Sequence, residues 1–134
     1  MHHHYILDDA GNVVPCDLMT WARWFENVEN RRVAFDEVGD YQVSTIFLGL
    51  DHSFDYGPQD PLTWKPVLWE SIIFDVIRDC KEMLRYRSRE AALAGHAHLV
   101  ELARKLQESQ ESQLADLFKE VETSLGQDSG LDVT

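Results

Sequence analysis

The chain has 134 residues, of which 44% are hydrophobic, and it carries a formal net charge of −12. This length suits one domain with a single core. A strongly acidic surface repels nucleic acid and anionic membranes, so the charge argues against direct nucleic-acid or membrane binding and favours a basic protein partner or simple solubility. Cys16 and Cys80 show no zinc-binding spacing, and no secretory signal or long apolar run is present. We therefore expect a cytoplasmic protein with reduced thiols and without a metal or cofactor.

The N-terminal part predicts a hairpin and then a helix. Residues 5–15 hold two short β-type runs around Asp-Asp-Ala-Gly-Asn, which is typical of a turn. A helix is predicted over 16–30, with Asp17 as its N-cap. Its apolar stripe, which we expect to face the core, consists of Leu18, Trp21, Trp24, Phe25 and Val28. The opening histidines, residues 2–4, fit either a native start or the remnant of a purification tag, and they are left out of the chemistry.

The middle of the chain predicts four strands and one long loop. Residues 31–50 predict two strands around a Val-Gly-Asp turn. A third strand is predicted over 67–79 and a fourth over 80–87. Between the second and third of these strands, residues 51–66 predict a long loop with three prolines and a glycine, and loops of this length are often functional.

The C-terminal part predicts one or two further helices. A helix over 88–108 is capped by Ser88, and its predicted buried stripe is Ala92, His96, Leu99, Ala103 and Leu106. Residues 109–126 predict a third helix or a continuation that ends at Gly126. Its apolar stripe is Leu114, Leu117, Phe118, Val121 and Leu125. The remaining residues, 127–134, predict a disordered acidic tail.

This order of elements predicts one α+β domain over residues 1–126. We expect a mostly antiparallel sheet with helices packed on one face. Residues 107–134 hold seven acidic residues and one lysine, which is half of the net charge. An acidic helix with one apolar stripe can cover its own sheet or dock on a partner, and covering is the default expectation.

Four blocks of sequence resemble a widespread family of small phage and prophage proteins. They are YILDDAGNVVPCDLMTWARWFE (5–26), STIFLGLDHSF (44–54), LWESIIF (68–74) and RYRSREAALAGH (85–96). The resemblance covers about residues 5–104 and follows the order of the family's blocks. Because that family has no established activity, the resemblance implies a phage origin and a host bacterial cytoplasm, but no mechanism.

Titratable residues supply two candidate sites. A carboxylate beside an imidazole, as in Asp51 and His52, is what a general base needs, and Glu70 would lie near them if the flanking strands pair. The alternative is an Asx-type turn with a surface histidine. His96 and His98 point about 200° apart on a helix, so they cannot share a metal, and His96 is expected in the core.

Basic residues supply a further candidate. Arg85, Arg87 and Arg89, with Lys81, could hold a phosphate or pair with the chain's own acids, and we expect intramolecular pairing.

The long loop combines aromatic and acidic side chains, which are good anchors in protein interfaces. Its predicted partner-binding residues are Phe54, Asp55, Tyr56, Asp60 and Trp64. We therefore expect a protein that works by binding rather than by catalysis. The leading hypothesis is a phage-encoded protein that binds a basic host protein and acts as an anti-defence, anti-CRISPR-like inhibitor. Such an inhibitor would present carboxylates where DNA phosphates would otherwise lie.

Three other hypotheses stay open. The first is a small-ligand or nucleotide-binding or hydrolytic protein that uses Asp51, His52 and Glu70. The second is an accessory protein in phage assembly. The third concerns oligomeric state: the aromatic loop and the third helix offer apolar surface for a homodimer.

Overall fold

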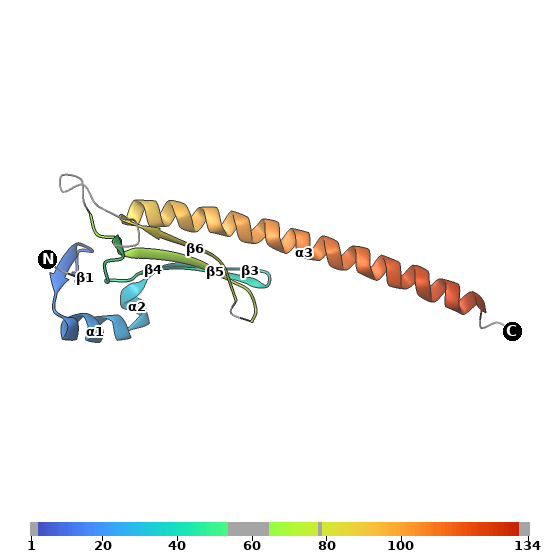
Figure 1. Cartoon of the computed structure of the whole chain (residues 1–134), viewed down its shortest axis with the longest axis horizontal. Coiled ribbons are helices and arrows are strands. Elements are labelled where there is room, and N and C mark those ends of the chain that lie inside the picture. Colours follow the sequence, from blue (N-terminus) through green and yellow to red (C-terminus); the bar gives the residue numbers. More distant parts are fainter. Residues whose placement is uncertain (1–2, 54–64, 78, 132–134) are drawn as a thin grey trace.

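The computed structural model describes residues 3–53, 65–77 and 79–131, with the backbone alone over 126–131. It confirms an α+β fold, in which a two-stranded hairpin precedes a four-stranded sheet and one long helix (Figure 1). The elements are β1 (His4–Leu7), β2 (Val13–Cys16), α1 (Leu18–Glu26), α2 (Val28–Arg31), β3 (Arg32–Val38), β4 (Tyr41–Phe47), β5 (Trp69–Phe74), β6 (Cys80–Tyr86) and α3 (Arg89–Leu131).

The sheet is fully antiparallel, in the order β3-β4-β5-β6, so all four predicted strands are confirmed. Burial alternates along β4 with period two, because successive side chains of a strand point to opposite faces. Tyr41, Val43, Thr45 and Phe47 are buried on the face that α3 covers. The predicted turn between β3 and β4 is also present, and Gly39 supplies its left-handed conformation with a φ of +58°.

The core lies between this face of the sheet and the first part of α3. Ser88 caps the helix, as predicted, by accepting a hydrogen bond from the backbone N–H of Ala91 at 3.1 Å. Ala92, Leu99 and Ala103 are fully buried against the sheet, and His96 lies among them, which confirms the predicted stripe. Gly95 lets the helix approach closely, because a Cβ there would collide with the Tyr86 ring.

The first helix differs from the prediction. It ends at Glu26, and Asn27 caps the short α2 instead. Leu18 and Val28 are exposed, so the stripe is not a core face over its whole length. The reason is that α1 packs against the hairpin and the end of β4: Trp21 Nε1 donates to the Leu48 carbonyl at 3.1 Å, and the Trp24 ring meets Phe47 edge-on.

The C-terminal helix is also longer than predicted. Residues 89–131 form one continuous helix, so the predicted stop at Gly126 is wrong, and residues 127–131 of the predicted disordered tail are helical. No proline occurs after Pro66, and a lone glycine weakens a helix without breaking it. Forty-three helical residues extend about 64 Å, whereas a seven-residue strand extends about 23 Å. Much of α3 therefore projects beyond the sheet (Figure 1).

The two parts of α3 should respond differently to the loss of a leucine side chain. Leu99→Ala removes a fully buried side chain, so we expect the free energy of unfolding to fall by about 2–5 kcal/mol. Leu117→Ala changes a side chain that is 53% exposed, and at low protein concentration it should stay within about 0.5 kcal/mol of the wild type. Urea unfolding followed by circular dichroism measures both, and equal losses would contradict this division of the helix.

Candidate protein-binding surface

Asp51 holds the two ends of the long connection between β4 and β5. Its carboxylate accepts hydrogen bonds from the backbone N–H of Ser53 at 2.8 Å, the Ser53 hydroxyl at 2.9 Å and the backbone N–H of Val67 at 3.0 Å. This is the Asx-type turn that the sequence offered as the alternative to an acid–base pair. The acceptor sites of the carboxylate are therefore engaged by backbone and hydroxyl groups.

The other members of the predicted catalytic set are engaged elsewhere. The backbone N–H of His52 donates to the Val67 carbonyl at 3.0 Å. Glu70, by contrast, forms an ion pair with Arg85 at 3.1 Å across β5 and β6. These contacts join Asp51 and His52 to Val67, and Glu70 to Arg85.

The basic segment confirms the expected intramolecular pairing in part. Arg85 pairs with Glu70, a carboxylate of the neighbouring strand, at 3.1 Å. Arg87 Nε donates to the Lys65 carbonyl at 3.0 Å. Lys81 pairs with Asp75 and Asp79. Within residues 3–53, 65–77 and 79–131, no group of three metal-ligating side chains comes together.

A polar network joins α3 to three strands; Thr45, Ser71 and His96 in it are buried, and Asp36 at its end is exposed. His96 Nδ1 lies 2.7 Å from the Thr45 hydroxyl, which lies 2.5 Å from the Ser71 hydroxyl. His96 Nε2 lies 2.7 Å from the Asp36 carboxylate. Because a carboxylate only accepts, Nε2 donates to Asp36, and in the neutral ring Nδ1 then accepts the Thr45 proton.

The order acid, imidazole, hydroxyl is that of an activated nucleophile. Thr45 and Ser71, however, have no exposed surface, so no substrate can reach either hydroxyl. The Tyr86 hydroxyl lies in the same interior, where burial raises its pKa against a smaller opposing effect of Ser71. The network is therefore an anchor between helix and sheet rather than a catalytic site.

The projecting part of α3 carries an uncovered apolar stripe. The apolar spacing of three or four residues stops at Leu106 and resumes at Leu114 after seven polar residues. Because eight residues make a little over two helical turns, the stripe from Leu114 onward lies on the same face as the residues that pack on the sheet. The side chains in it are 45–63% exposed, and no described part of the chain covers them. We call Leu114, Leu117, Phe118, Val121 and Leu125 the distal stripe. The expectation that this helix covers its own sheet is wrong for these residues, because the sheet ends before them.

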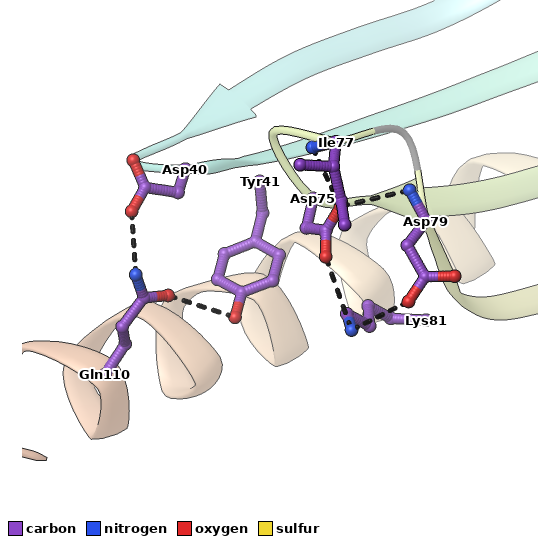
Figure 2. A network of polar contacts seen from close by, with 7 residues as sticks. All are labelled: Asp40, Tyr41, Asp75, Ile77, Asp79, Lys81 and Gln110. Carbon is purple, nitrogen blue, oxygen red and sulfur yellow. Dashed lines mark hydrogen bonds and ion pairs between the residues drawn. The ribbon is translucent and has the colours of Figure 1, made fainter.

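Polar contacts fix the point at which α3 leaves the sheet (Figure 2). Gln110 donates to the Asp40 carboxylate at 2.9 Å, and its carbonyl oxygen accepts from the Tyr41 hydroxyl at 3.3 Å. One turn earlier, Gln107 accepts from the backbone N–H of Asp40 at 2.9 Å. From Gln110 to Leu125 the helix extends a further distance of about 22 Å.

The β5–β6 turn lies at the same end of the sheet (Figure 2). Asp75 accepts hydrogen bonds from the backbone N–H groups of Ile77 and Asp79, each at 3.0 Å, and pairs with Lys81 at 3.3 Å. Partial desolvation acts to raise the pKa of Asp75, but these partners outweigh it and lower the pKa. The turn thereby presents Val76 and Ile77, which are 72% and 79% exposed, to solvent.

The predicted partner-binding residues Phe54, Asp55, Tyr56, Asp60 and Trp64 lie outside the described residues. The structure shows a different exposed apolar surface, the distal stripe, whose spacing is visible in the sequence but whose exposure is not. Val76 and Ile77 were assigned to a strand. The aspartates at positions 75 and 79, which flank them, are the sequence signal for a turn.

Comparison with known proteins gives no relative: no protein-family model, curated protein or solved structure matches this chain. Among the described residues, no helix is both long enough and apolar enough to cross a membrane.

The polar network predicts that substitutions at Thr45 and His96 are energetically coupled. Thr45→Val removes the hydroxyl and leaves His96 Nδ1 and Ser71 Oγ without this partner, which should cost about 1–3 kcal/mol of unfolding free energy. In a His96→Leu background the same substitution should cost less, because its partner is already gone. Chemical denaturation of the wild type, the Thr45→Val and His96→Leu variants and the double variant measures this coupling. Thr45→Ser, which keeps the hydroxyl, is the control, and purely additive losses would contradict the network.

The β5–β6 turn predicts a local pH dependence. Because the pKa of Asp75 is lowered in the folded chain, its stabilisation of the turn is complete above the ordinary aspartate pKa of about 3.9 and is lost as the pH falls through the lowered value. The amide NMR signals of Ile77 and Asp79 should titrate together, with a midpoint below that ordinary value. Asp75→Asn should abolish this titration. A midpoint at or above the ordinary value would contradict the assignment.

Proposed function

We propose that this protein acts by binding another protein through the projecting part of α3. The observation that carries this proposal is the distal stripe: five large apolar side chains on one helical face, each about half exposed. Exposed apolar groups that form one contiguous face mark interaction sites. Burying a Leu, Val or Phe side chain contributes about 1.5–3 kcal/mol, so a partner that covers this stripe gains a large driving force.

The spacing of the stripe defines the form of the interaction. Leu114, Leu117, Phe118 and Val121 stand at i, i+3, i+4 and i+7, the arrangement by which an amphipathic helix lies in an apolar groove. The helix is already folded and anchored at Gln107 and Gln110, so binding does not have to order it. This preorganisation lowers the entropic cost of association.

The charge of the helix defines the kind of partner. Residues 111–125 contain four acids, Glu111, Asp116, Glu120 and Glu122, and one lysine. We infer that the partner presents an apolar groove with a basic rim, because like charges across an interface are costly and opposite charges speed association. A bacterial host protein whose basic surface serves nucleic acid has this character. An anti-defence role in a phage-infected host is thus the biological setting that we propose, and the support for it is the acidic apolar helix together with the phage-like sequence blocks.

Site-specific photocrosslinking tests this proposal. A photoreactive phenylalanine analogue at Phe118 of the full chain should crosslink to a defined protein in a bacterial lysate. The same analogue at Ser112, on the opposite side of the helix, should not. The adduct should also weaken as salt rises, since screening reduces attraction between exposed charges.

Substitutions complete the test. Leu117→Asp with Phe118→Asp places charge in the stripe and should abolish partner recovery, whereas Ser112→Asp with Thr123→Asp adds the same charge elsewhere and should preserve it. Circular dichroism confirms that both variants stay helical. Equal recovery by the two variants would overturn the proposal, because the stripe would then have no role in binding.

A further inference from the structure

The face of the sheet opposite α3 is a second apolar surface. In the described part of the chain, α1 and α2 border this face at one end only (Figure 1). Ile46, Ile72 and Phe74 are partly exposed on it, and Met83 is 45% exposed. Together with Phe25 and Val28, Ile46, Ile72 and Phe74 line a groove of about 280 Å³. We call this groove, with its rim, the back-face groove.

The rim of the back-face groove is basic, although the protein as a whole is acidic. Arg31 and Arg32 both line it. Their guanidinium groups lie 4.4 Å and 4.7 Å from the ring centres of Phe25 and Phe35, which holds the charges over an apolar floor. The carboxylate that lines the groove, Glu70, is neutralised by Arg85 at 3.1 Å. An apolar floor with a cationic rim is complementary to an acidic amphipathic helix.

The chain itself contains such a helix but cannot place it there. The distal stripe is apolar, with Glu111 and Glu122 beside one edge and Glu120 beside the other. Yet α3 lies on the opposite face of the sheet and continues unbroken beyond it (Figure 1). The helix and the groove of one molecule therefore cannot meet, whereas those of two molecules can.

We propose that the back-face groove binds the distal stripe of a second copy of this chain. This inference rests on the proposed function, since it uses the same stripe and names one partner for it. The second copy's helix would add a layer to the open face of the sheet, just as the first part of α3 already covers the front face. The contact is heterologous, joining two different surfaces, so it produces either a closed ring or an open chain of copies.

Charge favours this arrangement over pairing between two distal stripes. A symmetric helix pair would place the acidic edges of two helices, each with four acids and one lysine over 111–125, against each other. Docking on the groove instead places those acids beside Arg31 and Arg32. The two arrangements respond oppositely to salt: high salt weakens helix–groove docking and relieves the repulsion in a helix pair.

A complementation experiment with full-length chains tests the proposal. Leu117→Asp/Phe118→Asp damages the stripe and keeps the groove, and Arg31→Glu/Arg32→Glu damages the groove and keeps the stripe. Light scattering and sedimentation should show that the wild type rises above the monomer mass of 15.5 kDa as its concentration increases. Each variant alone should remain monomeric. An equal mixture should form a one-to-one dimer, because the intact stripe of one chain meets the intact groove of the other.

Controls and contrary results are well separated. Ser112→Asp/Thr123→Asp should associate like the wild type, and circular dichroism must show that every variant is folded. A groove variant that still associates, or a mixture that fails to associate, would overturn the proposal in favour of helix pairing or of no self-contact. A wild type that stays monomeric while Phe118 still crosslinks to a foreign protein would overturn this inference alone. Loss of both the self-association and the crosslink would remove the proposed function as well.

Discussion

The docking of one face of α3 on the sheet determines the rest of this structure. Apolar side chains supply most of that contact, but His96 sets its position, because its ring must reach Thr45 on one side and Asp36 on the other. A shift of the helix by one turn would separate His96 from the buried Thr45 hydroxyl and from Asp36, at a cost that apolar packing alone would not impose. The network therefore fixes the register of α3. The register in turn decides which residues are covered and which project.

Both secondary-structure layers of the domain are half covered. Within the described residues, the front of the sheet is covered and its back is largely open, while the first part of α3 is covered and its distal stripe is open. Opposite charges accompany the two open surfaces, with arginines at the groove and carboxylates along the helix. This opposite charge is the observation behind the proposed contact between the helix of one copy and the groove of another.

Local patterns in the sequence were sufficient for most of the fold. Alternation identified the strands, and Asp17 and Ser88 cap the expected helices. The predicted stripe is buried from Ala92 to Ala103 and partly buried at Leu106. The errors arose where tertiary packing decides. The stripe predicted over 16–30 has helical spacing, yet the helix breaks at Asn27 and α1 packs on the hairpin and the end of β4, so Leu18 in α1 and Val28 in α2 remain exposed. In the same way, Asp51 beside His52 fits both a base and a turn, and only the positions of Ser53 and Val67 distinguish them.

The distal stripe shows what periodicity leaves undetermined. A spacing of three and four residues indicates that one helical face is apolar. The spacing is the same before and after Gln110, although only the part of the helix before Gln110 meets the sheet. The information that separates the two parts is length. A strand of seven residues covers about 23 Å, so a continuous helix of 43 residues must extend well past it, whatever its pattern. Because residues 89–131 form one continuous helix, the apolar residues beyond the sheet lie outside the core that the described residues build, and this exposure is the observation from which we propose a protein-binding role for them.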